Sequence, residues 1–182
     1  MDDIAQEFRL YLISGERIVW TGRPALGVRF SGRDVFLVPF SILWAGFAFF
    51  WEGSVLTIGA LSPMALFGVP FILAGLYLTV GRFLVDAWAR SRTIYALSDQ
   101  RALILRRVLG DRLIAVTLSK APQLRLNVRG RTGDIEFEQL VSMFGSRGWG
   151  VWNPALDGGA RFIGVENPTE IYQMAQRGAG GV

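Results

Sequence analysis

Two long uncharged runs dominate the pattern of apolar and polar positions along the chain. The first covers 35–51, and the second covers 53–81, where 61–81 is the most apolar part. A bilayer core of about 30 Å needs about 20 helical residues, with about 17 as a practical minimum. The pattern therefore predicts two membrane-spanning helices, at about 35–51 and 61–81, joined by the stretch 52–60. The alternative is a pair of buried core helices, but little amphipathic helix remains elsewhere in the chain to cover them.

The placement of arginine predicts the orientation of this hairpin. Arginines stand on both outer flanks of the two runs, at Arg17, Arg23, Arg29, Arg33, Arg82, Arg90 and Arg92. The connecting stretch 52–60 has no Lys or Arg. By the positive-inside rule, both termini are expected in the cytoplasm and the short loop outside, in a multi-pass protein of the cytoplasmic membrane. The first run begins too late, and without a simple basic segment before it, to be a signal peptide.

A helical stalk is one interpretation of the residues that follow the second run. Arg82, Asp86 and Arg90 recur every four residues, so they would share one ion-paired face if the helix continued beyond the membrane. Trp88 would then lie at the level of the lipid headgroups. A simple interfacial anchor is the equally open alternative.

Small residues within the two runs indicate where the helices approach each other. Ser41 and Ala45 lie in the first run, and Gly75 and Thr79 in the second. Such residues allow close helix packing, although they are common in any membrane span.

A change to two-residue periodicity after residue 92 predicts an antiparallel sheet. The hairpin 93–97 and 101–105 flanks Ser98-Asp-Gln100, whose side chains favour a turn through local hydrogen bonds. Four more strands are expected at 113–118, 123–128, 134–138 and 161–165. Before the hairpin, a short helix with Ile4, Phe8 and Leu12 on one face precedes a strand at 16–21. If both flanks are cytoplasmic, that strand can join the later ones, giving about seven strands in a meandering sheet.

The end of the chain carries the signals of a helix N-terminus. Asn167 is a good N-cap, Pro168 takes the first helical position, and Glu170 completes a capping box. Ile171, Met174 and Ala175 share an apolar face that would pack against the sheet. The predicted fold class is thus an α+β membrane protein. Its parts are an N-terminal cytoplasmic segment, a transmembrane helical hairpin, a cytoplasmic domain and a flexible tail, at 1–34, 35–85, 86–177 and 178–182.

Composition narrows the chemistry that this chain can carry out. It has no cysteine and no histidine, which excludes disulfides, thiolate metal sites and a Ser-His-Asp relay. No nucleophile elbow, P-loop or metal-ligand spacing occurs either. In 134–138 acidic and apolar residues alternate, which is more typical of a strand with one wet face than of paired catalytic carboxylates. We therefore predict no catalytic residue, no cofactor and no metal, and the scattered arginines argue against nucleic acid as a partner.

Two segments are candidate interaction sites. Arg125, Arg129 and Arg131 line one strand face and the following turn, which suits anionic lipid headgroups, although a solvated hairpin tip is the alternative. The stretch 140–159 is long and rich in Gly and aromatic residues. Its apolar side chains would enter the membrane interface, grip a partner or merely cover an open sheet edge; they are Met143, Phe144, Trp149 and Trp152.

Three motifs in this order resemble the bacterial pleckstrin-homology-like (PH-like) membrane proteins. They are Gly15-Glu-Arg-Ile-Val-Trp-Thr-Gly-Arg-Pro24, Thr93-x-Tyr-x-Leu-Ser-Asp-x-Arg101 and Phe162-Ile-Gly-Val-Glu-Asn-Pro-Thr-Glu-Ile-Tyr172. The resemblance implies a strongly bent antiparallel sheet closed at one end by the last helix, in the bacterial inner membrane. It also implies a protein that is not an enzyme.

These observations lead to an expected function and expected partners. We expect a membrane-anchored PH-like module that binds or scaffolds proteins at the cytoplasmic face. Its partners would be membrane lipids and a membrane or cytoplasmic protein, with a homo-oligomer also open. The alternatives are a sensor of anionic lipid headgroups and an assembly factor for a membrane protein complex. A photosynthetic-complex assembly factor has a similar opening motif but carries more spans.

Overall fold

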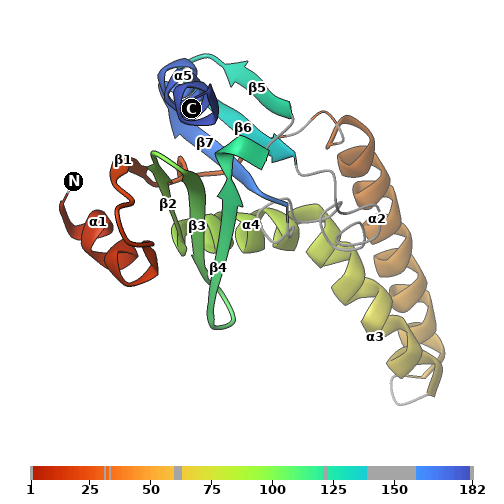
Figure 1. Cartoon of the computed structure of the whole chain (residues 1–182). Helices are drawn as coiled ribbons and strands as arrows, with labels where there is room; N and C mark the ends of the chain where they lie inside the picture. The colour runs from red at the N-terminus through yellow and green to blue at the C-terminus, as the bar shows by residue number, and fades with distance from the viewer. Residues whose placement is uncertain are drawn as a thin grey trace. The chain divides into compact units, whose positions relative to one another are not determined.

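The computed structural model describes residues 2–30, 32, 34–59, 63–120, 123–138 and 159–180. The candidates Met143, Phe144, Trp149 and Trp152 lie outside these residues. The chain forms two compact units. One, the β unit, combines Met1–Gly27 with Asp86–Val182, and the other, the helical hairpin, is Val28–Val85 (Figure 1).

The helical hairpin consists of two long apolar helices that pack together. The first is α2 (Asp34–Ile58), and the second begins with α3 (Pro63–Leu76). A π-helical segment, η2 (Tyr77–Gly81), and α4 (Arg82–Ser91) continue the second helix, so helical structure runs from Pro63 to Ser91. Both helices are long and apolar enough to cross a bilayer.

The first helix is longer than the predicted span. Residues 52–58 were expected to form part of the outer loop, yet α2 continues through them to Ile58. Glu52 and Val55 are buried in this extension. Once a helix is nucleated, each added residue gains a hydrogen bond at little cost, so one charged residue does not end it.

Small residues form the contact between α2 and α3, as the sequence predicted. A Cβ added at Gly75 would lie 3.0 Å from the Cα of Ala45, so the two backbones meet closely there. The Thr79 hydroxyl donates to the Gly75 carbonyl oxygen at 2.7 Å and lies 3.4 Å from the Ser41 carbonyl oxygen. The π-helical segment η2 contains this Thr79 contact.

The outer surface of the hairpin is covered by large apolar side chains. Phe36 is 80 % exposed, and Leu43, Phe50 and Leu66 are each 74 % exposed. Less than a quarter of the most apolar stretch of either helix is buried. The alternative of two core helices enclosed by a soluble fold therefore does not describe this structure.

The described residues of the β unit form seven antiparallel strands in two sheets. Sheet A has the order β1 (Ile18–Gly22), β2 (Thr93–Ser98), β3 (Arg101–Arg107) and β4 (Asp111–Thr117). Sheet B has the order β5 (Gln123–Arg129), β6 (Thr132–Glu138) and β7 (Arg161–Glu166). Each strand matches one that the sequence predicted. The expected single meander is divided in two, because the 3-10 helix η3 (Leu118–Lys120) follows β4 and buries Leu118.

Two apolar clusters cover opposite faces of sheet A. The larger lies between the sheets and α5 (Pro168–Gly180), where the ring of Phe162 packs 4.7 Å from Tyr95 and 4.8 Å from Phe137. The second lies beneath α1 (Asp2–Phe8) and η1 (Arg9–Tyr11) and consists of Phe8, Ile94, Ala96, Leu103 and Leu105. Because both faces are covered, β2 and β3 are buried almost throughout instead of in alternation.

The C-terminal helix packs on sheet B and extends beyond its predicted end (Figure 1). It begins at Pro168 as predicted, and the amides of Glu170 and Ile171 donate to the Asn167 carbonyl oxygen. The predicted tail at 178–182 is wrong at its start, since the helix continues to Gly180. A Cβ at Gly178 would lie 2.6 Å from Leu118 Cδ1, so this end of the helix lies against η3.

Candidate functional site

A network of hydrogen bonds is centred on the buried carboxylate of Glu16. It joins the part of the β unit that precedes the helical hairpin to the part that follows it. Glu16 accepts hydrogen bonds from the Ile13 amide at 2.8 Å, the Ser98 hydroxyl at 2.6 Å, and the Nη2 of Arg101 at 2.5 Å. Arg101 also donates to the Tyr11 carbonyl oxygen at 3.0 Å. The motif at 15–24 is therefore in direct contact with the motif at 93–101, through residues more than 80 positions apart.

The same network sets the ionisation of its members. Burial by itself raises the pKa of Glu16, but the hydrogen bonds from Arg101, Ile13 and Ser98 outweigh burial and lower the pKa to about 2. Its hydrogen bond to Glu16 raises the pKa of Arg101. Ser98 also accepts from the amides of Gln100 and Arg101, which forms the turn that the sequence predicted. These bonds hold the pair charged and fixed, which suits a structural clamp.

A second set of contacts fixes the segment that follows β1. The Ala25 amide donates to the Gly164 carbonyl oxygen of β7 at 2.8 Å. Arg90 is 1 % exposed and donates to the carbonyl oxygens of Ala25 and Gly27, at 2.6 and 2.5 Å, and to Asp86 at 2.9 Å. The segment is thereby held against both β7 and the end of α4.

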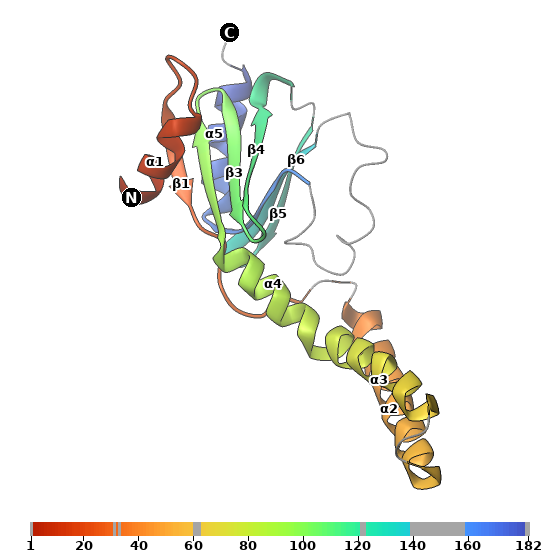
Figure 2. The same cartoon turned by 90° about the horizontal axis from the view of Figure 1, so that it is seen from below.

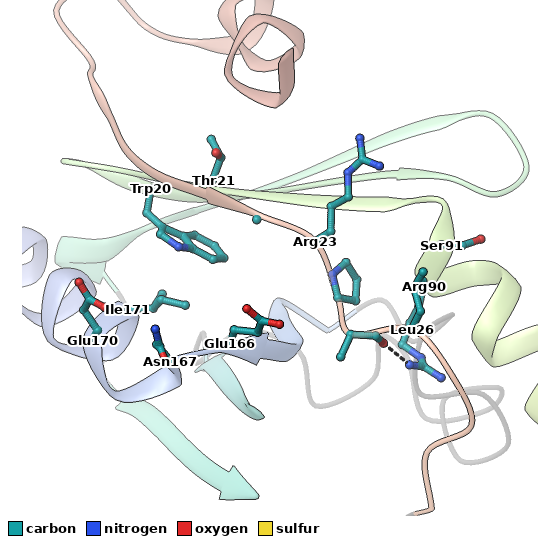
Figure 3. A pocket seen from close by; sticks show the side chains of 13 residues that line it. Trp20, Thr21, Arg23, Leu26, Arg90, Ser91, Glu166, Asn167, Glu170 and Ile171 are labelled. Carbon is teal, nitrogen blue, oxygen red and sulfur yellow. Dashed lines mark hydrogen bonds between the residues drawn. The ribbon is translucent and has the colours of Figure 1, made fainter. Parts of the chain in front are cut away.

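A cavity of about 620 Å³ lies between this segment and the start of α5 (Figure 3). It is lined by Trp20, Thr21, Gly22, Arg23, Pro24, Ala25, Leu26, Arg90, Ser91, Glu166, Asn167, Glu170 and Ile171. Its volume falls within the range of small-molecule binding pockets. All of these residues belong to the β unit, so the cavity is part of that unit.

The walls of this cavity combine an aromatic surface with acidic groups. Figure 3 shows the Trp20 indole turned toward Ile171 of α5, with the Glu166 carboxylate nearby, while Arg23, just after β1, extends to the opposite side of the chain. A side chain at Gly22 would collide with the Trp20 ring, so this glycine provides the room for the indole. Glu166 and Glu170 are both exposed. An aromatic face beside two carboxylates suits a cationic group with an apolar stem.

The predicted stalk residues form two separate ion pairs. Arg82 pairs with Asp34 at 2.6 Å, within the helical hairpin, and both side chains are buried. Asp86 pairs with Arg90 at 2.9 Å, within the β unit. The expected pairing of Asp86 with Arg90 is present, but Arg82 pairs with Asp34 instead of joining them. Asp34 is the first residue of α2, so the four-residue spacing of the stalk residues could not predict this pair. Trp88 is 43 % exposed, and the Arg92 guanidinium lies 5.7 Å from its ring.

The three arginines proposed to bind lipid headgroups lie on a different part of the β unit from the cavity. Arg125 and Arg129 are on β5, and Arg131 follows in the β5–β6 turn; all three are exposed. Across the β5–β6 ladder, Arg125 faces Glu136 and Arg129 faces Thr132. None of the three lines the cavity, so the structure keeps these two candidate sites apart.

Sequence reasoning missed the cavity and the contact made by Glu52. Its carboxylate occupies the space that a Cβ at Gly68 of α3 would fill, and its Oε2 has no hydrogen-bond partner among the residues that the structure describes. Among the described residues, no group of three or more acidic side chains is arranged to hold a metal ion. Comparison with protein-family models, curated proteins and solved structures finds no match.

Proposed function

We propose that the chain is a membrane-anchored, non-catalytic binding module whose β unit lies at the cytoplasmic face of the bacterial inner membrane. The observation that carries this proposal is the pairing of β1 with β2. Strand β1 precedes the helical hairpin and β2 follows it, so both ends of a membrane-spanning hairpin must lie on the same side of the membrane. With arginines on both flanks, the positive-inside rule makes that side the cytoplasm.

The surface of the hairpin supports insertion into lipid. Its large apolar side chains point outward, and small residues fill the contact between α2 and α3. In water, an exposed apolar surface of this extent favours association or aggregation. In a bilayer, the same surface is matched to its surroundings, and the helices satisfy their own backbone hydrogen bonds.

The β unit supports a PH-like fold. A four-stranded and a three-stranded antiparallel sheet, with a C-terminal helix packed on the second, agree with the bent and capped sheet that the resemblance implies. The clamp between Glu16 and Arg101 joins two of the motifs that resemble the PH-like proteins, which gives a physical reason for these motifs to occur together.

The cavity is the proposed binding site of the module. Trp20 and Ile171 offer apolar contact, and Glu166 and Glu170 place negative charge at its wall. We propose a protein partner that presents a Lys or Arg side chain on an extended segment. A membrane or cytoplasmic protein is the expected source, and an assembly role in a membrane complex is one form of this function. A second copy of the chain is the alternative partner.

Photocrosslinking in native membranes tests this site. A photoreactive amino acid at Leu26, an exposed residue of the cavity lining, should form a specific adduct. Glu166→Lys with Glu170→Lys should strongly reduce this adduct, because reversed charge repels a cation. The matched control is the same amino acid at Ser119, which is exposed in η3 and does not line the cavity. Identical adducts from both positions, unchanged by the charge reversal, would contradict the proposal.

Sensing of anionic headgroups through the β5–β6 turn is the second candidate function. The exposure of Arg125, Arg129 and Arg131 favours it, since cations near an anionic leaflet contribute about 1 kcal/mol each.

A further inference from the structure

We propose that the β3–β4 turn is a second point of membrane contact, in which Leu109 enters the interface of an anionic bilayer between flanking arginines. This goes beyond the proposed function, because neither the hairpin anchor nor the cavity requires it. Leu109 is 96 % exposed, the highest value among the large apolar side chains of the described residues. It precedes Gly110, whose φ of +107° forms the tight turn. A single exposed leucine is ordinary, so the inference depends on what surrounds it.

A continuous set of contacts places this turn beside an exposed tryptophan. The Arg107 amide donates to the Arg92 carbonyl oxygen at 2.9 Å, which joins the end of β3 to the residue before β2. The Arg92 guanidinium in turn lies over the Trp88 ring. Figure 2 shows the β3–β4 turn at the end of sheet A where α4 leads into β2. Tryptophan and arginine together are typical of the boundary between lipid and water.

The charge around the turn is predominantly positive. Four arginines, Arg92, Arg106, Arg107 and Arg112, are adjacent to the turn or to its contacts. Two acidic residues, Glu7 and Asp111, oppose them, and both pair with Arg107. Four cations minus two anions leave an excess of two, and the side chains of Arg92 and Arg112 are exposed. An anionic lipid surface complements this charge, whereas an uncharged apolar partner would leave it unmatched.

The covalent path of the chain limits how far this end of the β unit can lie from the end of the hairpin. Trp88 lies in α4, and the helix that α4 completes runs back without a break to Pro63 in the helical hairpin. Arg92 lies seven positions after Val85, the last residue of the hairpin unit. Most of that interval is helical, so it spans about 10 Å at 1.5 Å per residue. A turn bonded to Arg92 is therefore tethered close to the point where the chain leaves the lipid.

A cysteine label on the full-length protein tests the proposal, since the chain has no native cysteine. Leu109→Cys carries an environment-sensitive fluorophore, and the protein is reconstituted in vesicles of phosphatidylcholine with or without phosphatidylglycerol. With phosphatidylglycerol present, we expect a blue shift of the emission and loss of fluorescence to a lipid that carries a quencher in its acyl chain. Arg92→Gln with Arg112→Gln should reduce both effects.

Two further label positions make the result decisive. Ser119→Cys follows the opposite end of β4, so its label should remain in water in both vesicles. Arg131→Cys reports on the β5–β6 turn. A label at position 109 that behaves like the one at 119 would overturn the proposal, as would quenching at 131 without quenching at 109. Equal quenching at 109 with and without phosphatidylglycerol would overturn the part assigned to the arginines.

Discussion

Replacing Glu16 with Gln is expected to remove a large, pH-dependent part of the stability of the β unit. The carboxyl has a pKa of about 2 in the folded protein, against an ordinary value of 4.5. A group whose pKa is lowered on folding stabilises the fold above its unfolded pKa and loses that effect as the pH falls through the folded value. A difference of two to three pKa units corresponds to about 3 kcal/mol. The wild-type protein should therefore lose about 3 kcal/mol more than the variant between pH 5 and about pH 2.

Chemical unfolding of the full-length protein in detergent micelles, followed by tryptophan fluorescence, measures this effect. Other carboxylates titrate in the same range, so the difference between wild type and Glu16→Gln isolates the clamp. Glu170→Gln is the matched control, because Glu170 is exposed on α5. The stability of this variant should depend on pH as that of the wild type does. Arg101→Met should also destabilise the β unit near neutral pH, since it leaves a buried carboxylate without its cation. Parallel curves for wild type and Glu16→Gln at all pH values would refute this account of the clamp.

Gly75→Leu is expected to separate the two helices of the hairpin. Even a Cβ at this position would press on the Ala45 backbone, which cannot rotate away as a long side chain can. Overpacking of this kind costs about 1–3 kcal/mol. Spin labels at Leu43→Cys and Leu73→Cys, both on the exposed surface of the hairpin, should move apart in bilayers.

Gly46→Leu provides the control for this substitution. Gly46 also lies in α2, but a Cβ there meets none of the described residues within 4 Å. The distance between the labels should therefore be the same as in the parent protein. If Gly75→Leu also left that distance unchanged, the close approach of α2 and α3 at Gly75 would be wrong.

Local pattern predicted most of the elements of this fold. The strand at 16–21 and the hairpin at 93–105 were recognisable from their apolar residues and from the polar turn at Ser98. Their pairing followed from a topological argument, since a hairpin that returns to one side brings its flanks together. Pro168 likewise marked the start of α5, because proline suits the first position of a helix.

Contacts between distant residues were not accessible from the sequence. The cavity depends on Trp20 meeting Glu166 and Ile171, which only the packing of β1 against β7 and α5 determines. Asp34 as the partner of Arg82 was missed for the same reason, since a four-residue spacing suggested Asp86 instead. The sequence predicted that the loop starts at Glu52, because a charged residue normally ends an apolar run. In the structure, Gly68 has no side chain, and the Glu52 carboxylate fills that space inside the hairpin.

Labelling of single cysteines from one side of the membrane tests the central claim most directly. In intact spheroplasts, a maleimide that cannot cross the membrane should react with Gly59→Cys, at the outer end of α2. Gln6→Cys in α1 and Arg177→Cys in α5 should react only after permeabilisation. All three positions are exposed, so differences in reactivity report the side of the membrane. Reaction of either terminal cysteine in intact spheroplasts, or extraction of the protein without detergent, would contradict a hairpin that crosses the bilayer and returns to the cytoplasm.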